Sequence, residues 1–226
     1  MLALKQALSL VSTRALGGSW QPSDETDLEA WYKNQTGITL AGSDVAIWAD
    51  SSSNSFDMRQ PTLAEQPAYN SGDILFTPAD THNLATASDI TLSGAFTVGI
   101  KLEPDVSNVA VIGSNTTTNE FFKITSTTNL RFKTDGSQVD IGIDSGTLVA
   151  ALNLVITRNS SNLITLYIDG VAQADTETLA GTADINAIGV RATDANPYDG
   201  TISEIQVYGA ESTSLTANVN DYLSNI

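Results

Sequence analysis

One stretch, Leu152 to Ala172, constrains the fold of this chain more than any other. Apolar residues alternate with other residues in two runs on either side of a polar turn, with Leu152, Leu154 and Ile156 in the first run and Ile164, Leu166 and Ile168 in the second. This period predicts half-buried strands, because successive side chains leave opposite faces of a strand. The polar turn at residues 159–162 and the tight Asp169-Gly170 turn are both typical of β-hairpins. The sequence therefore predicts two consecutive hairpins in an antiparallel β protein.

The charge balance limits the partners that such a protein can have. The 226 residues, 41% of them hydrophobic, are enough for one packed all-β domain, which can run to about 200–250 residues. With 10 basic and 26 acidic residues, the net charge of −16 repels phosphate backbones and anionic headgroups. We therefore expect no nucleic-acid partner. We also expect no membrane span, because no apolar run approaches the ~18 residues that a span needs.

Residues 1–18 differ from the rest of the chain. Leu4, Leu8, Val11 and Ala15 recur at helical spacing, and Gly17-Gly18 ends the pattern. Two interpretations of this predicted helix stay open: it caps the domain, or it is an attachment or oligomerisation segment outside it. A signal peptide is a third, weaker reading, because polar residues interrupt the apolar stretch. We expect the attachment segment, since a lone helix of about 15 residues is marginal in water and needs a partner.

A polar linker over residues 19–27 is expected to precede the main domain at residues 28–226. From Phe96 onward, short strand patterns recur about every 8–12 residues, which is typical of an all-β sandwich or barrel. Near Ser203 the apolar alternation changes phase, which predicts a β-bulge. The chain then returns to helical spacing behind a serine and threonine cluster, at Leu215, Val219, Tyr222 and Leu223. We expect one short C-terminal helix packed on the sheets.

An ordered set of segments resembles the concanavalin A-like, laminin-G-type jelly-roll domains. The set consists of Leu28 to Tyr32, Ile47 to Asp50 with Ser53-Asn54, Gln66 to Tyr69, Phe96 to Val98, Leu166 to Gly170, Asp199 to Ile205 and Tyr222-Leu223. The resemblance implies two antiparallel sheets packed face to face. Lectins, adhesion modules and glycoside hydrolases all use this fold, so the resemblance alone does not determine function.

The pattern of acidic residues argues against catalysis. Glycosidases need two carboxylates close together, and an alternating Glu-x-Asp-x-x-Glu strand would supply them. The candidate acids Glu103, Asp105, Glu120 and Glu204 instead stand singly. The one histidine, His82, lies in a polar turn without a nucleophile motif, and the absence of cysteine excludes thiol chemistry. We expect no enzyme activity and no required cofactor.

Structural calcium is a separate expectation. Asp50, Ser52 and Asn54 present oxygen atoms at alternate positions, as calcium loops do, but the glycine and final glutamate of an EF-hand are missing. The resemblance implies calcium near this loop and near Asp199. The alternative is that Asp50 and Asn54 hydrogen-bond only to the backbone of their own turn.

Ligand contacts are expected in a late loop. Trp31 and Trp48 lie among apolar neighbours, which favours the core over sugar binding. Asp194, Asn196 and Tyr198 combine hydrogen-bonding groups with an aromatic ring, so we predict that these three contact a ligand.

The sequence as a whole favours a non-catalytic binding or structural module that works outside cells. Short, acidic, cysteine-free domains of this kind with an N-terminal attachment segment resemble bacteriophage virion components, such as capsid decorations, head fibres or tail-surface proteins. Residues 1–18 would then contact other virion proteins or a second copy of the chain, and the domain would contact a cell-surface glycan. The alternative is a free secreted lectin-like or adhesion domain. A glycoside hydrolase remains only if carboxylates distant in sequence converge.

Overall fold

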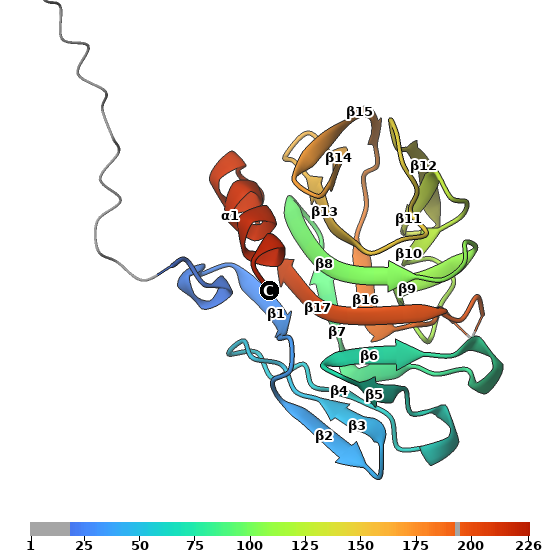
Figure 1. The fold of residues 1–226 in the computed structure, drawn as a ribbon. Helices are drawn as coiled ribbons and strands as arrows, with labels where there is room; N and C mark the ends of the chain where they lie inside the picture. The colour runs from blue at the N-terminus through green and yellow to red at the C-terminus, as the bar shows by residue number, and fades with distance from the viewer. Residues whose placement is uncertain (1–18, 193–194) are drawn as a thin grey trace, which may run out of the picture.

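The computed structural model describes residues 19–192 and 195–226, which form two packed layers of antiparallel strands with one helix outside (Figure 1). The predicted all-β sandwich with a short C-terminal helix is confirmed. The predicted N-terminal helix, with Leu4, Leu8, Val11 and Ala15, lies outside the described residues.

The layer that carries the helix, here called the helix layer, is built around β17. Its strands pair in the order β15, β14, β13, β8 and β17, and β1 and β6 share the other edge of β17. The bounds are β1 (Leu28–Tyr32), β5 (Ala68–Asn70), β6 (Asp73–Phe76), β8 (Phe96–Pro104), β13 (Leu152–Arg158), β14 (Leu163–Ile168), β15 (Val171–Thr178) and β17 (Gly200–Tyr208).

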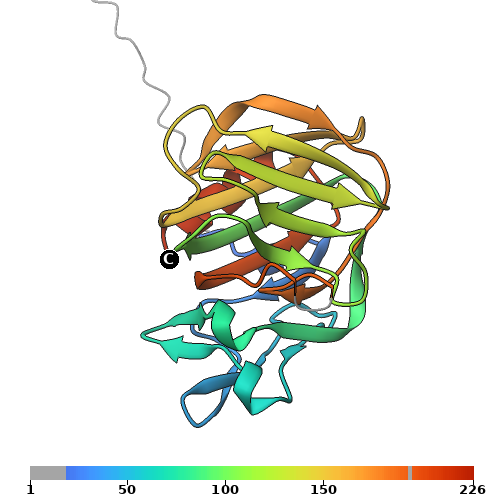
Figure 2. The same cartoon turned by 90° about the vertical axis from the view of Figure 1, so that its right-hand side faces the viewer.

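The opposite layer contains the remaining strands, and Figure 2 shows β9 to β12 side by side on it. Its strands are β2 (Ile38–Ala41), β3 (Asp44–Trp48), β4 (Met58–Arg59), β7 (Leu84–Leu92), β9 (Val109–Gly113), β10 (Phe121–Ile124), β11 (Asn129–Thr134), β12 (Ser137–Gly142) and β16 (Ala183–Ile188). A single pairing between β3 and β5 connects the layers along one edge. The short 3-10 helices are η1 (Pro22–Asp24), η2 (Leu63–Glu65) and η3 (Pro78–Asp80).

Both predicted hairpins are present. β13 pairs with β14, and β14 pairs with β15 across the Asp169-Gly170 turn. Both turn residues have positive φ, +48° and +82°, and this conformation matches the twist of paired strands. The predicted bulge is also confirmed, because the register of β17 on β8 shifts between Ile202 and Glu204.

The main core lies between the two layers, and Trp48 is buried there as expected. A second, smaller cluster lies outside the helix layer, beneath α1 (Thr213–Ser224). The hydroxyl of Ser212 caps this helix by accepting a hydrogen bond from the Leu215 backbone nitrogen at 3.1 Å. Gly99 on β8 allows the close approach, since a Cβ at that position would lie 2.5 Å from a Val219 methyl carbon. Trp31 belongs to this second cluster and is also buried, as predicted.

Two segments differ from expectation. The strand patterns that recur after Phe96 in the sequence include residues 188–192, and the prediction of a strand there is wrong, because β16 ends at Ile188 and Gly189 turns the chain with a φ of +86°. Residues 19–27, expected as a linker, include η1 and pack on the domain through Trp20. Within residues 19–192 and 195–226, no helix is long and apolar enough to cross a membrane.

Candidate functional site

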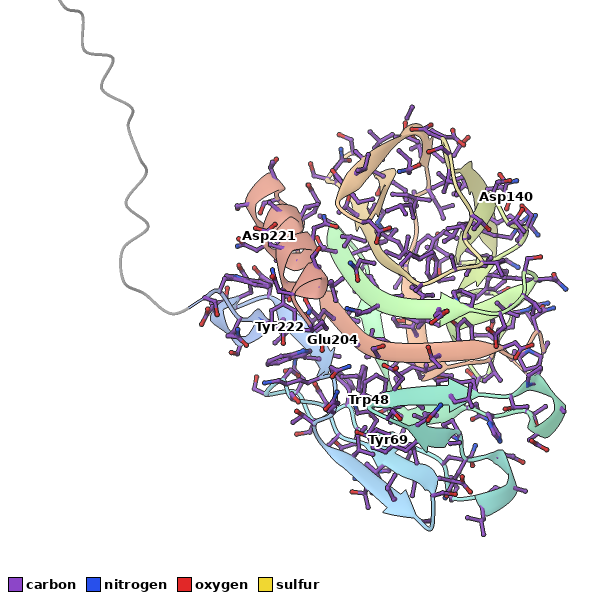
Figure 3. All side chains as sticks on the ribbon, viewed as in Figure 1. Trp48, Tyr69, Asp140, Glu204, Asp221 and Tyr222 are labelled. Carbon is purple, nitrogen blue, oxygen red and sulfur yellow. The ribbon has the colours of Figure 1, made fainter. Side chains whose placement is uncertain are left out.

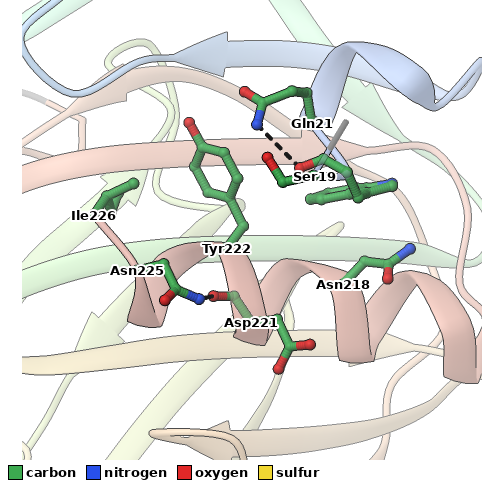
Figure 4. A pocket seen from close by; sticks show the side chains of 8 residues that line it. Ser19, Gln21, Asn218, Asp221, Tyr222, Asn225 and Ile226 are labelled. Atoms are coloured by element: carbon green, nitrogen blue, oxygen red, sulfur yellow. Dashed lines mark hydrogen bonds between the residues drawn. The ribbon is translucent and has the colours of Figure 1, made fainter. Parts of the chain in front are cut away.

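A pocket of about 500 Å³ opens between the chain just before η1 and the last turns of α1 (Figure 4). We call it the Tyr222 pocket. Its lining residues are Ser19, Trp20, Gln21, Asn218, Asp221, Tyr222, Asn225 and Ile226. Four of them occupy positions i, i+3, i+4 and i+7 of the C-terminal segment, so they share one face of the helix. The apolar residues of the same helix face β8 and β13 instead.

Three aromatic rings line up at this pocket. The Tyr222 ring stands edge to face with Trp20 at 6.1 Å and with Trp31 at 6.2 Å between ring centroids, at interplanar angles near perpendicular. Trp20 is held in turn by a 2.8 Å hydrogen bond from its indole nitrogen to Glu25. Trp31 is buried, whereas Trp20 and Tyr222 remain partly exposed. The pocket therefore presents aromatic surface that neighbouring residues hold in place.

A buried carboxylate lies beneath these rings, on β17 (Figure 3). Glu204 accepts hydrogen bonds from the Trp31 indole nitrogen at 2.6 Å, from the Asn34 backbone nitrogen at 2.7 Å and from the Gln206 amide at 3.0 Å. Burial raises the pKa of Glu204, and these hydrogen bonds act in the opposite direction. Because neighbouring donors occupy both of its oxygens, Glu204 supports the aromatic rings and is not available to a substrate.

The Tyr222 hydroxyl keeps its proton at ordinary pH. Burial, followed by the nearby Glu204 carboxylate, raises the pKa of Tyr222 to about 12. Within the described part of the chain, this hydroxyl, the Asn218 amide and the Asp221 carboxylate make no hydrogen bond. Free donors and acceptors thus lie beside two aromatic rings, which suits a small molecule with many hydroxyl groups and one apolar face.

The residues predicted to contact a ligand are arranged differently. Tyr198 is fully buried, with its ring edge to face on Phe76 at 5.8 Å and its hydroxyl donating to the Thr201 carbonyl at 3.2 Å. The prediction that Tyr198 contacts a ligand is therefore wrong, because its ring is part of the core. Asn196 accepts a 2.8 Å hydrogen bond from the Arg191 Nε. Asp194 lies outside the described residues.

The predicted calcium ligands do not fit one site. The Asp50 carboxylate accepts from the backbone nitrogens of Trp31, Ser52 and Phe56 and from the Ser52 hydroxyl, at 2.6–3.0 Å. The Asn54 amide donates to the backbone carbonyls of Leu28 and Glu29 on β1. These side chains thus bond backbone groups, as in the alternative to calcium, but the bonded groups include those of β1 as well as those of the turn.

Asp199 lies apart from that loop. Asp50 accepts a hydrogen bond from the Trp31 backbone, and Trp31 on β1 lies opposite Gln206 on β17. Asp199 instead lies just before the first residue of β17. Seven residues of strand separate these points, or about 20 Å. No group of three or more metal-binding acidic or histidine side chains occurs among residues 19–192 and 195–226. Calcium binding itself stays a prediction that a melting experiment tests.

The sequence did not identify the Tyr222 pocket. Tyr222 was assigned to the apolar stripe of the helix, and Trp20 to a linker. The helical spacing of Asn218, Asp221, Tyr222 and Asn225 was a usable signal for one wall. The other wall depends on where residues 19–21 pack, which no local pattern reveals.

Comparison with known proteins gives the family. Residues 77–216 match the model of the concanavalin A-like lectin/glucanases superfamily, Laminin_G_3, which is more than half of the chain. The chain belongs to this superfamily. No curated protein sequence matches it significantly.

Several solved structures share this concanavalin A-like fold. Domain 4 of AbnA, an extracellular GH43 arabinanase from Geobacillus stearothermophilus in complex with arabinotriose, aligns at a TM-score of 0.61 and 17% identity, over 86% of this chain and 98% of that domain. The binding domain of Paraclostridial Mosquitocidal Protein 1 aligns at a TM-score of 0.61 and 14% identity, over 91% of this chain and 53% of that domain. The binding domain of botulinum neurotoxin DC in complex with SialylT aligns at a TM-score of 0.52 and 14% identity, over 82% of this chain and 52% of that domain. The chain thus spans about half of each toxin domain, and these likenesses show the fold alone.

Proposed function

We propose that this concanavalin A-like protein is a non-catalytic carbohydrate-binding module and that the Tyr222 pocket holds the sugar. The observation that carries the proposal is the pairing of the partly exposed Trp20 and Tyr222 rings with the free polar groups of Asn218 and Asp221. An aromatic ring covers the apolar face of a sugar, and the polar groups bond its hydroxyls. The complexes of structurally similar domains with arabinotriose and SialylT support the general class.

We further propose that the module is displayed outside cells, as a virion component attached through residues 1–18. Support comes from the apolar stripe of Leu4, Leu8, Val11 and Ala15 and from the acidic, cysteine-free composition. The alternative is a secreted lectin-like or adhesion domain. Comparing purified virions with culture supernatant by mass spectrometry separates these two locations.

The sugar-binding proposal is tested by calorimetry of the full chain against neutral arabino-, gluco- and galacto-oligosaccharides. The double variant Asn218→Ala, Asp221→Asn removes one free amide and exchanges one free carboxylate for a neutral amide without touching the core, and we expect it to weaken binding about tenfold or more. Asp27→Asn makes the same charge change at an exposed residue outside the pocket and should bind normally. Equal affinity of the double variant and the parent would contradict the proposal, as would no binding to any sugar.

The proposed absence of catalysis has its own test. A retaining or inverting glycosidase needs two carboxylates that flank the bond. Glu204, the candidate acid nearest to the pocket, is fully engaged by neighbouring donors. We expect no release of reducing ends from arabinan, β-glucan, alginate or agarose. Release that one Asp or Glu substitution abolishes would overturn this.

A further inference from the structure

The basic residues of this acidic chain are unevenly placed. Of its 10 lysines and arginines, Lys5 and Arg14 lie outside the described residues, which leaves eight. Four of these eight gather on the opposite layer around Phe121, and we call this group the cationic face. Its members are Lys123 on β10, Arg131 and Lys133 on β11, and Arg191 in the loop after β16.

Strand register brings these side chains together. Phe121 pairs with Lys133 across β10 and β11, and Lys123 pairs with Arg131. Residues two apart on one strand, and residues directly opposite on the next, leave the same face of a sheet. The alternate residues of β10 and β11, among them Phe122 and Phe132, lie in the core between the layers. The cationic face therefore points outward, away from the core.

An aromatic ring, rather than a carboxylate, holds two of these cations. The Arg191 guanidinium carbon lies 5.0 Å from the Phe121 ring centroid, and the Lys133 ammonium lies 5.7 Å from it. The Nε of Arg191 donates to the neutral amide oxygen of Asn196 at 2.8 Å. The Glu120 carboxylate also interacts with the Lys133 charge, whereas Arg191 has no ion pair within the described residues.

The third cation, Lys123, is the most unusual. Only 8% of this residue is accessible, so its stem is covered, while its ammonium nitrogen reaches the surface. It makes no hydrogen bond or ion pair within the described part of the chain. Burial lowers the pKa of Lys123, and the charges of Arg191 and Arg131 lower it further. Its ammonium, at the end of a covered stem, therefore lies at the surface without a partner, and a bound anion would favour its charged form.

The remaining basic residues in the described ranges are already occupied. Lys33 lies over the Trp31 ring near Glu204, Arg59 pairs with Asp57, and Lys101 donates to carbonyls at the end of α1. Arg158 donates to backbone carbonyls. On the cationic face only Arg131 has a paired carboxylate, Asp140, at 2.6 Å.

The charge of the whole molecule limits which anion fits. At −16, the chain repels an extended polyanion along most of its length, and screening acts only beyond roughly 8 Å at physiological salt. A ligand with a single carboxylate can contact the local cations without placing further negative charge near the acidic remainder of the surface. Asn196 lies at the edge of the face, and its amide nitrogen makes no hydrogen bond within the described residues, so it offers a donor to a neighbouring hydroxyl.

We propose that the cationic face is a second binding site, which takes a sugar that carries one carboxylate, with Lys123 and Arg191 contacting the carboxylate. That the ligand is a sugar rests on the proposed function. That it carries one carboxylate rests only on the uncompensated cations.

Calorimetry of the full chain tests this with a sialylated trisaccharide, a galacturonate-terminated trisaccharide and neutral lactose. We expect one or both acidic sugars to bind, more weakly at ~0.5 M than at ~0.05 M NaCl, and lactose not to bind this face. The double variant Lys133→Gln, Arg191→Gln should weaken acidic-sugar binding about tenfold or more. Arg59→Gln, the matched charge change at an arginine that has its own carboxylate partner, should leave it unchanged.

A second measurement does not depend on the variants folding. Side-chain NMR of Lys123 should show its pKa rising when the acidic sugar binds, since an anion favours the ammonium. An unchanged Lys123 pKa, or an affinity that the double variant does not alter, would overturn the proposal. Loss of acidic-sugar binding in Asn218→Ala, Asp221→Asn alone would assign the carboxylate to the Tyr222 pocket and overturn it too. If acidic sugars bind and neutral sugars do not, the result contradicts only the proposal that the Tyr222 pocket holds a neutral sugar.

Discussion

The two outer faces of the sandwich differ in how their charged side chains are partnered. Beneath α1, the fully buried Glu204 accepts three hydrogen bonds from side chains and backbone around it. On the opposite layer, Lys123 has a covered stem but brings its ammonium nitrogen to the surface, where it makes no hydrogen bond or ion pair within the described residues. Figure 3 places Glu204 near Tyr222 and well apart from Asp140, which marks the cationic face. A buried charge with matched donors stabilises the fold, whereas a charge at the surface without a partner is available to a ligand.

The largest effect should come from breaking the Glu204 network. Glu204→Ala leaves the Trp31 indole and the Asn34 backbone nitrogen without acceptors, so we expect a loss of about 3 kcal/mol in the free energy of unfolding. Urea denaturation measures it. Glu204→Gln, which keeps one acceptor and the shape, should cost less than Glu204→Ala but still destabilise; a Gln variant as stable as the parent would mean that volume, and not hydrogen bonding, sets the effect.

The Asp50 carboxylate extends the same rule to an edge of the helix layer. Asp50→Ala removes the acceptor for three backbone nitrogens and one hydroxyl, and we expect a loss of about 2 kcal/mol. Because these contacts need no metal, the loss should be the same in chelator and in millimolar calcium. A calcium-dependent melting temperature that Asp50→Ala erases would instead restore the calcium prediction.

Lys123→Met, unlike the two preceding variants, should not lower the free energy of unfolding. The variant keeps the apolar stem and removes an unpartnered charge, so we expect stability unchanged or raised by about 1 kcal/mol. The pKa of Lys123 is lowered, so the unfolded chain binds more protons between that lowered pKa and the ordinary 10.5. Stability of the parent should therefore rise with pH across this window, and the variant should lack that contribution. A strong destabilisation at neutral pH would show that Lys123 has a structural partner.

The smallest effect is expected from deleting residues 1–18. The main core and the cluster beneath α1 both form among described residues that begin after this segment. The shortened chain, residues 19–226, should keep its melting temperature within a few degrees and lose only its association with virions or with other copies. A much lower melting temperature, or aggregation, would show that residues 1–18 cap the domain and contribute to its stability.

The fold was predictable wherever one face of an element is apolar. The hairpins after Leu152 and the helix at Leu215 follow from alternation and helical spacing. β7 and β16 were not found, because the middle of β7 is exposed and polar, and because buried Val190 and Ala192 continue an apolar pattern past the turn at Gly189.

The sites were harder to predict than the fold. The Tyr222 pocket needs Trp20 to pack across the chain, and the cationic face needs the register of β10 on β11 and the loop that carries Arg191. Both depend on contacts between segments distant in sequence. The residue type and loop position of Tyr198 are typical of a ligand contact, but its ring is buried in the core.

The central claim, that the protein holds a sugar at the Tyr222 pocket, is tested most directly by chemical-shift mapping. The isotope-labelled full chain is titrated with the neutral oligosaccharide that binds best by calorimetry. We expect saturable shifts at Trp20, Asn218, Asp221 and Tyr222, with little change at Lys123. Saturable shifts confined to other surfaces, or none with any oligosaccharide, would contradict it.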